Sequence, residues 1–315
     1  MVNEKIPVNI ISGFLGSGKT TAIIKLLHEK TSDEKWAVII NEFGKISIDS
    51  QTLQTSSEAG NVFEISGGCI CCSAKGYFRE NLEEILKTGI YSRIIIEPSG
   101  LGGVDMVSEI VNANADLKLM PVVCLVDMAG IENVRLQQLP IYRTQIRKAD
   151  LIVLTKRDLL TDRAMEERVV ANFKSMYPDK ETVLKPEKNG FWFSLIDLGD
   201  PAAKEEIKFR MILTDEKQLK DDNYQVSSHI FKTDITFSTN RLLQYFNKNQ
   251  SIIRAKGHLL TEKGWVLLNF TLSGCTFEPC EAKNQSELVI ITERLKPDQT
   301  NTFNEEIMAS AILEK

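Results

Sequence analysis

Histidine and cysteine are scarce in this chain, and long apolar runs are missing. The 315 residues contain three histidines and six cysteines, so there is neither a histidine-rich tract nor a disulfide-dense framework. No apolar run approaches the length that spans a membrane, and no basic segment with an apolar stretch behind it opens the chain. We therefore expect a cytoplasmic protein that does not insert into a membrane.

An excess of basic charge is also missing. Lysine and arginine number 38 against 43 aspartates and glutamates, which gives a net charge of −5. This balance disfavours a generally basic surface, so we expect no nucleic-acid partner. The length favours two domains that each bury a core of their own without disulfide bonds.

The first 180 residues alternate between short β-branched runs and amphipathic stretches. This alternation is typical of an α/β fold in which helices flank a mostly parallel sheet. Several of the runs are continuously apolar, as expected of strands buried on both faces. We predict strands at residues 8–12, 36–41, 62–65, 93–97, 121–127 and 151–155, and helices at residues 20–30, 77–88, 105–113, 138–148 and 162–176.

Farther along the chain, the pattern weakens into proline, glycine and charged residues, which indicate a connection between domains. We place the first domain at residues 1–200, a linker at 201–228 and a smaller α+β domain at 229–315. In the second domain we predict strands at residues 230–237, 265–272 and 288–291, and helices at residues 241–247 and 302–313.

A complete phosphate-binding loop follows the first predicted strand. Gly13, Gly16 and Gly18 stand where the backbone must turn its N–H groups toward phosphate oxygens. We expect Lys19 to bridge the terminal phosphates and Thr20 to place its hydroxyl on Mg²⁺. The neighbouring residues Ser17 and Thr21 are expected to help hold the nucleotide.

A second phosphate-side segment ends the predicted strand at residues 93–97. Glu97 closes this apolar strand and Gly100 follows three positions later. Glu97 is placed to hold Mg²⁺ through water or to orient the attacking water, and the Gly100 N–H to contact the γ-phosphate. Taken alone, the segment is also compatible with a strand that ends in an ordinary turn, which is the less favoured interpretation.

A base-reading segment follows the last strand of the first domain. Residues 155–158 read Thr-Lys-Arg-Asp, a variant of the Asn-Lys-x-Asp pattern. Asp158 can accept hydrogen bonds from guanine N1–H and N2–H₂, which adenine cannot offer, and Lys156 can cover the base with its aliphatic stem. Thr155 replaces an amide by a hydroxyl that still forms one hydrogen bond. The segment predicts a preference for guanine.

Three cysteines stand close together at Cys69, Cys71 and Cys72, between a predicted strand and a predicted helix. Thiolates at this spacing suit a soft or borderline transition metal, with a fourth ligand from elsewhere or from water. Two other interpretations stay open. One is a redox pair, although spacings of one and zero residues strain a disulfide. The other is a set of buried, inert thiols.

Taken together, these motifs resemble the CobW-like metal-chaperone GTPases, relatives of the nickel-delivery GTPases of urease and hydrogenase maturation. The resemblance covers most of the chain and includes the Asn-Glu-Phe-Gly segment at residues 41–44 and a basic Arg-Ala-Lys-Gly segment at residues 254–257. It implies that Glu42 and Asp49 belong to a first switch, with Asp49 near Mg²⁺, and that the three cysteines bind metal close to the phosphates.

The function implied by the resemblance is hydrolysis of GTP to GDP coupled to the binding of Zn²⁺ or Co²⁺ and its delivery to a client metalloprotein. On this hypothesis, Lys19, Glu42, Asp49 and Glu97 form the catalytic set. Ile40 and Lys45 stand where some relatives carry acidic residues, which leaves the fourth metal ligand open. The sequence also leaves open whether the protein forms a homodimer.

Two other functions remain compatible with the sequence. A P-loop kinase or ATPase acting on a small molecule would use the cysteines as a structural zinc site and would not prefer guanine. A GTP-regulated binding module would bind its client with negligible hydrolysis. Relative affinity for GTP and ATP tests the first, and single-turnover hydrolysis tests the second.

Overall fold

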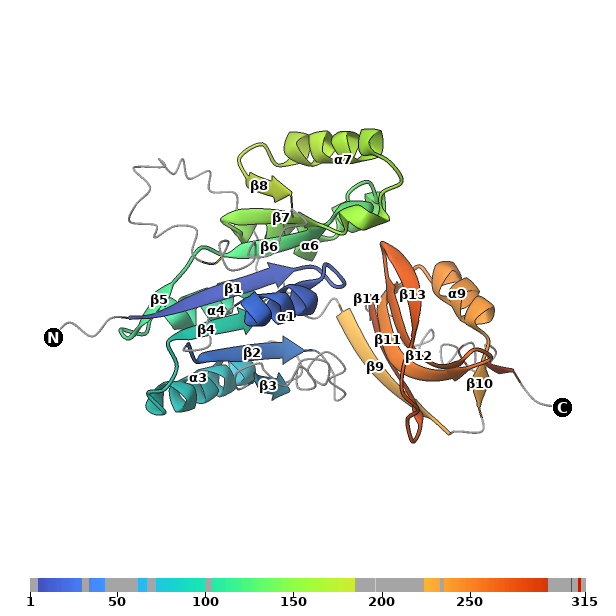
Figure 1. Cartoon of the computed structure of the whole chain (residues 1–315), viewed down its shortest axis with the longest axis horizontal. Coiled ribbons are helices and arrows are strands. Elements are labelled where there is room, and N and C mark those ends of the chain that lie inside the picture. Colours follow the sequence, from blue (N-terminus) through green and yellow to red (C-terminus); the bar gives the residue numbers. More distant parts are fainter. Residues whose placement is uncertain are drawn as a thin grey trace. The chain divides into compact units, whose positions relative to one another are not determined.

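The computed structural model divides the chain into two compact units, each described here by itself (Figure 1). The described residues up to Ile196 belong to the first unit, and those from Tyr224 onward belong to the second. Within the described part of the chain, no helix has the length and apolar character needed to cross a membrane. The structure describes residues 5–29, 34–42, 62–66, 72–99, 103–184, 196, 224–232, 235–293, 307 and 311–312.

The first unit is built on an eight-stranded sheet in which every described pairing is parallel. Its order is β3-β2-β4-β1-β6-β7-β8, with β5 also paired to β1. This confirms the predicted α/β fold class. The strands are β1 (Ile6–Gly13), β2 (Trp36–Glu42), β3 (Val62–Ser66), β4 (Arg93–Glu97), β5 (Leu117–Leu119), β6 (Val123–Asp127), β7 (Leu151–Thr155) and β8 (Glu181–Leu184).

Strand β1 lies inside the sheet, with β4 on one side and β5 and then β6 on the other. Ile6 pairs with Leu117 of β5, and Ile11 pairs with Val123 of β6. After β1 the chain continues to β2, on the β4 side of β1. After β4 it continues to β5 and β6, on the opposite side of β1. Such a divergence between neighbouring parallel strands marks where α/β folds bind ligands, beyond the carboxyl ends of the strands.

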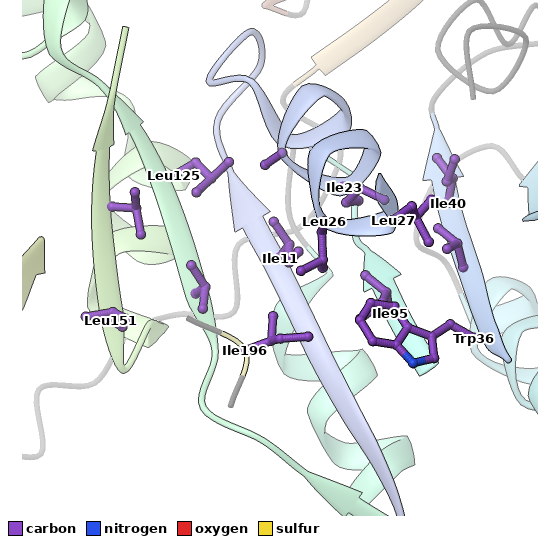
Figure 2. Close-up of a cluster of buried hydrophobic side chains, with 14 residues drawn as sticks. Ile11, Ile23, Leu26, Leu27, Trp36, Ile40, Ile95, Leu125, Leu151 and Ile196 are labelled. Atoms are coloured by element: carbon purple, nitrogen blue, oxygen red, sulfur yellow. The ribbon is translucent and has the colours of Figure 1, made fainter. Parts of the chain in front are cut away.

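Helices flank this sheet, and α1 supplies part of the core (Figure 2). Ile23, Leu26 and Leu27 of α1 join a buried cluster that includes Ile11 of β1 and Ile95 of β4. Their spacing along the helix explains why one face of α1 is apolar. The helices are α1 (Lys19–Glu29), α3 (Cys72–Lys87), α4 (Val104–Asn112), α5 (Val134–Gln138), α6 (Pro140–Lys148) and α7 (Arg163–Met176), with 3₁₀ helices η1 (Met128–Gly130) and η2 (Arg157–Leu159).

The helix predicted at residues 138–148 is interrupted near its start. Helix α5 ends at Gln138, Leu139 is extended at φ −67° and ψ 118°, and α6 begins at Pro140. Proline has no N–H for a helix interior and disfavours helical geometry in the residue before it, but it is well placed at the first helical position. Two helices therefore replace the predicted one.

In the second unit, helix α9 (Thr239–Lys248) and several strands pack around a separate core. Its strands are β9 (Tyr224–Phe231), β10 (Thr236–Phe237), β11 (Ile252–Thr261), β12 (Gly264–Thr271), β13 (Gly274–Pro279), β14 (Ser286–Glu293) and β15 (Ala311–Ile312). Most of their pairings are antiparallel. Leu242 and Phe246 of α9 bury against Ala255, Leu259 and Leu268. The α+β character is confirmed.

Three predictions for this unit were wrong in detail. The strand expected at residues 230–237 is two strands, β9 and β10, and β9 already begins at Tyr224, inside the predicted linker. The helix expected at residues 302–313 does not extend to its end, because Ala311 and Ile312 form β15 and pair with β10. Strand β11, which contains the basic Arg-Ala-Lys-Gly segment, was not predicted.

Glycine is required at the centre of β11. A Cβ atom on Gly257 would lie 2.1 Å from the Glu287 carbonyl oxygen and 2.8 Å from the Leu288 Cα, both on β14. These are backbone atoms of a paired strand and cannot move without breaking the pairing. The segment at residues 254–257 thus has a structural role in addition to its basic charge.

Candidate nucleotide-binding site

The phosphate-binding loop lies at the carboxyl end of β1, as predicted. Gly13, Gly16 and Gly18 have φ values of 145°, 79° and 93°, a range that side chains with a Cβ rarely adopt. A Cβ on Gly13 would also approach the Leu125 carbonyl oxygen and Ser17 Oγ to 2.5 Å each. The loop ends at Lys19, the first residue of α1, so the positive end of the helix dipole underlies it.

Lys19, Thr20 and Glu97 meet beside this loop. Thr20 Oγ1 lies 3.3 Å from Glu97 Oε2 and 3.4 Å from Oε1, within hydrogen-bond distance. Lys19 Nζ lies 4.0 Å from Glu97 Oε1 and donates to the Phe14 carbonyl oxygen at 3.3 Å. Both charged side chains are 6% exposed. Sequence reasoning had linked Glu97 to this site across 77 residues of chain, and the structure brings them together.

The loop has an unused polar atom that a phosphate would satisfy. Ser17 is 2% exposed, and its Oγ has no hydrogen-bond partner among the described residues. A buried hydroxyl without a partner is costly, whereas a phosphate oxygen would accept its hydrogen bond. With the buried Lys19 ammonium and the positive-φ glycines, the loop fits a nucleotide phosphate chain.

Phe14 of this loop makes an aromatic contact that anchors the loop to α6. Its ring packs edge-on against Tyr142 of α6, with ring centroids 5.9 Å apart. Both rings are buried, and burial raises the pKa of the Tyr142 hydroxyl far above its ordinary value. Tyr142 therefore supports the loop as a neutral packing residue.

The predicted base-reading segment follows β7, close to the phosphate loop. The Thr155 hydroxyl lies 2.9 Å from the Ser17 carbonyl oxygen, to which it donates. Lys156 Nζ donates to Asp127 Oδ2 at 2.9 Å, and the Arg157 guanidinium pairs with Glu166 of α7. Asp158 is exposed, and no hydrogen bond or ion pair joins its carboxylate to another described residue.

Asp127 is the residue of this site that sequence reasoning missed. It ends β6, is 6% exposed, and pairs in register with Thr155 of β7. A buried strand that ends in an acidic residue was the signal that identified Glu97, and the segment at residues 123–127 carries the same signal. Thr21, predicted to contact nucleotide, is an exposed residue of the first turn of α1.

Several predicted site residues lie outside the described residues. Asp49, Cys69, Cys71 and Gly100 are among them. For Glu42, the last residue of β2, and Cys72, the first of α3, only the backbone is described. No group of three or more metal-ligating His, Cys, Asp or Glu side chains occurs in the described part of the chain. The free thiols described there are Cys124, Cys275 and Cys280.

The fold and the loop geometry define a P-loop nucleotide-binding protein. Residues 7–184 match the family model described as CobW/HypB/UreG, nucleotide-binding domain, and residues 226–304 match the cobalamin synthesis protein cobW C-terminal domain. The chain therefore belongs to the CobW/HypB/UreG family, which confirms the resemblance deduced from the motifs.

Individual relatives match about half of the chain. The zinc chaperone YeiR of Escherichia coli is 37% identical over 156 residues, which are 49% of this chain and 47% of YeiR. The zinc-regulated GTPase metalloprotein activator 1 of Schizosaccharomyces pombe is 29% identical over 171 residues, 51% of this chain and 41% of that protein. The chain thus matches less than half the length of either relative.

A solved structure, zinc-bound YjiA GTPase from Escherichia coli, is similar over 96% of this chain and 99% of YjiA. Its identity is 19% and its TM-score is 0.42, a likeness too low to support an argument.

Proposed function

We propose that this protein is a GTP-hydrolysing metal chaperone that couples its nucleotide state to the binding of a transition metal and its delivery to a client metalloprotein. The main support for nucleotide binding is that Lys19, Thr20 and Glu97 lie close together at the carboxyl end of β1. The base-reading segment, tied to the same loop through Thr155, supports guanine as the base.

The buried polar groups support a division of roles in hydrolysis. The Lys19 ammonium, now shared between the Phe14 carbonyl oxygen and Glu97, would turn to the terminal phosphate oxygens. Thr20 would hold Mg²⁺ with its hydroxyl, together with Asp49, and the bound ion supplies positive charge that offsets the charge of the phosphates. Glu97 would orient the attacking water and keep Thr20 in place.

The metal half of the proposal is supported by the cysteine motif and by the names of relatives. Cys69, Cys71 and Cys72 stand in the sequence between the first switch and Glu97. Relatives are named as a zinc chaperone and a zinc-regulated GTPase, which favours zinc as the cargo over cobalt. GTP and Mg²⁺ would draw residues 41–49 and 97–100 toward the γ-phosphate and so change the metal affinity of the thiols.

We also propose a GTPase domain at residues 1–200 and a C-terminal domain that includes β9 and so begins by residue 224, in a cytoplasmic protein. The second domain would present the client-docking surface.

Anaerobic metal titration in the apo, GDP-bound and GTP-analogue-bound states tests the proposal. We expect one zinc per chain, with an affinity that differs between the two nucleotide states. Replacement of Cys69, Cys71 and Cys72 by serine should abolish binding, whereas Cys275→Ser with Cys280→Ser, in the second unit, should not. Unchanged metal stoichiometry in the GTP-bound triple variant would overturn the proposal.

A further inference from the structure

An ion pair joins two neighbouring strand ends at the base-reading side of the site. Lys156 Nζ lies 2.9 Å from Asp127 Oδ2, and the two side chains are 27% and 7% exposed. Asp127 is the last residue of β6, and Lys156 follows β7 directly. Because Asp127 and Thr155 are in register, the pair bridges the carboxyl edge of the sheet next to Asp158.

The Lys156 backbone has a conformation that needs support. Its φ of 58° and ψ of 37° are left-handed, and it is the one non-glycine residue with positive φ in the described part of the chain. For such a residue this conformation is strained, so surrounding contacts must hold it. The left-handed turn starts η2, the short helix that carries Asp158.

Asp127 is itself fixed by a second bond. Its Oδ1 accepts the Ala129 N–H at 3.0 Å and caps η1, while its Oδ2 receives the lysine amine. The carboxylate therefore has a single orientation before any ligand binds. The Lys156 side chain is consequently held at both ends. Its Cα is fixed because it follows β7 directly, and its ammonium is fixed by the ion pair with Asp127.

A lysine held at both ends is suited to cover a planar base. Its charge is compensated by Asp127, and its methylene stem forms a flat apolar surface with little rotamer freedom left to lose on binding. A mobile lysine would lose that freedom only when the nucleotide binds, which weakens binding.

We propose that Asp127 is a positioning residue of the guanine site, which acts by fixing Lys156 and, through its backbone, the carboxylate of Asp158. The proposal rests on the proposed binding of guanine nucleotides and adds a residue outside the Thr-Lys-Arg-Asp segment. In this proposal, Asp127 acts through its bonds to Lys156 and Ala129 rather than by contact with base or phosphate.

The Asp127→Asn variant separates positioning from capping, because the asparagine oxygen still caps η1 while the amide cannot neutralise Lys156. We expect GDP affinity to fall about tenfold, as for loss of a charge-assisted hydrogen bond, and discrimination between GDP and ADP to fall with it. Affinity for inorganic tripolyphosphate, which has no base, should stay unchanged. Glu132→Gln removes a surface carboxylate that pairs with Arg168 and is the matched control.

Lys156→Met keeps an unbranched apolar stem without the charge, and a double-mutant cycle tests whether Asp127 acts through it. We expect Asp127→Asn to add no further loss in the Lys156→Met background. Additive losses, wild-type GDP affinity in Asp127→Asn, or equal losses for GDP and tripolyphosphate would overturn the proposal. A wild-type protein that binds GDP and ADP equally would instead overturn the proposed GTP function.

Discussion

The Thr155 hydroxyl donates a hydrogen bond to the carbonyl oxygen of Ser17 across 2.9 Å, joining the proposed base-reading segment to the phosphate loop. Thr155 is 5% exposed, so this bond is shielded from bulk solvent. A movement of the phosphate loop would therefore move the proposed base-reading segment through this hydrogen bond.

Thr155→Val keeps the side-chain shape and removes the hydroxyl. Because the Ser17 carbonyl oxygen is then left without this donor, we expect GDP affinity to fall about tenfold. Isothermal titration measures the loss, and Thr155→Ser, which retains the hydroxyl, should bind nearly as the wild type does. Equal affinity in the valine and serine variants would contradict a role for the hydrogen bond.

Asp158→Asn tests the base specificity. An amide cannot accept both guanine donors, so we expect GTP affinity to fall on the order of a hundredfold or more. Xanthosine triphosphate carries a carbonyl oxygen where guanine has its amino group, and the asparagine N–H can donate to it. Competition between the two nucleotides should reverse in the variant, and a preference for GTP in both proteins would count against Asp158 as the base reader.

Thr20→Val should separate nucleotide binding from hydrolysis. Loss of the hydroxyl removes the hydrogen bond to Glu97 and a proposed Mg²⁺ ligand, so single-turnover hydrolysis should slow on the order of a hundredfold. Thr20→Ser restores the hydroxyl and should restore the rate. If the valine variant hydrolysed GTP as fast as the serine variant, Thr20 would have no part in the reaction.

Gly13→Ala should destabilise the first unit. The new Cβ would meet the Leu125 carbonyl oxygen and Ser17 Oγ at 2.5 Å, at a φ of 145°. Strain and overlap together predict a loss of about 3 kcal/mol in the free energy of unfolding, measured by urea denaturation. Gly76→Ala is the control: this exposed glycine in α3 has open space around it, and alanine there should stabilise the unit by about 0.5–1 kcal/mol.

The stability of the second unit should fall in mild acid. Burial lowers the pKa of His229 and of His258, each half-buried, below the ordinary value of about 6.5. As the pH falls below about 6.5, the two histidines bind protons in the unfolded chain before they do so in the folded one. The free energy of unfolding therefore decreases with falling pH, and it stops decreasing on this account once the pH is below the folded-state pKa values.

Thermal unfolding followed from pH 7.5 to 5 should show this loss, and it should be smaller in a variant with His229→Gln and His258→Gln. His28→Gln, at an exposed position of α1, is the control. An identical pH dependence in the double variant would show that other groups cause the change.

The sequence could predict that the phosphate loop, Glu97 and residues 155–158 lie together, because each motif is local and because parallel strands end at one edge of a sheet. Sequence reasoning missed Asp127 although this residue ends an apolar strand as Glu97 does; its ion pair with Lys156 depends on the register of β6 against β7, which no local pattern specifies. The break at Pro140 was readable from the proline itself.

In the second unit, the sequence contained signals that were not used. From Ile253 to Thr261, buried residues alternate with partly exposed ones, which is the period of a strand. The segment at residues 254–257 was interpreted only as a basic motif, so the strand was not predicted. The end of the predicted final helix depended on tertiary pairing, because Ala311 and Ile312 form hydrogen bonds with β10. A strand of two residues is too short to show an alternating pattern, so the helical spacing of apolar residues before it determined the prediction.

The position of β1 inside the sheet also determines how the protein can fold during synthesis. Val8 pairs with Ile94, and Ile11 pairs with Val123, so β1 leaves the ribosome well before these partners, which lie far along the chain. Pairing at such separations closes long loops and is slow. The nucleotide pocket is therefore completed late, after β7 has emerged, and nascent chains shorter than this should neither bind GTP nor protect β1 from proteolysis.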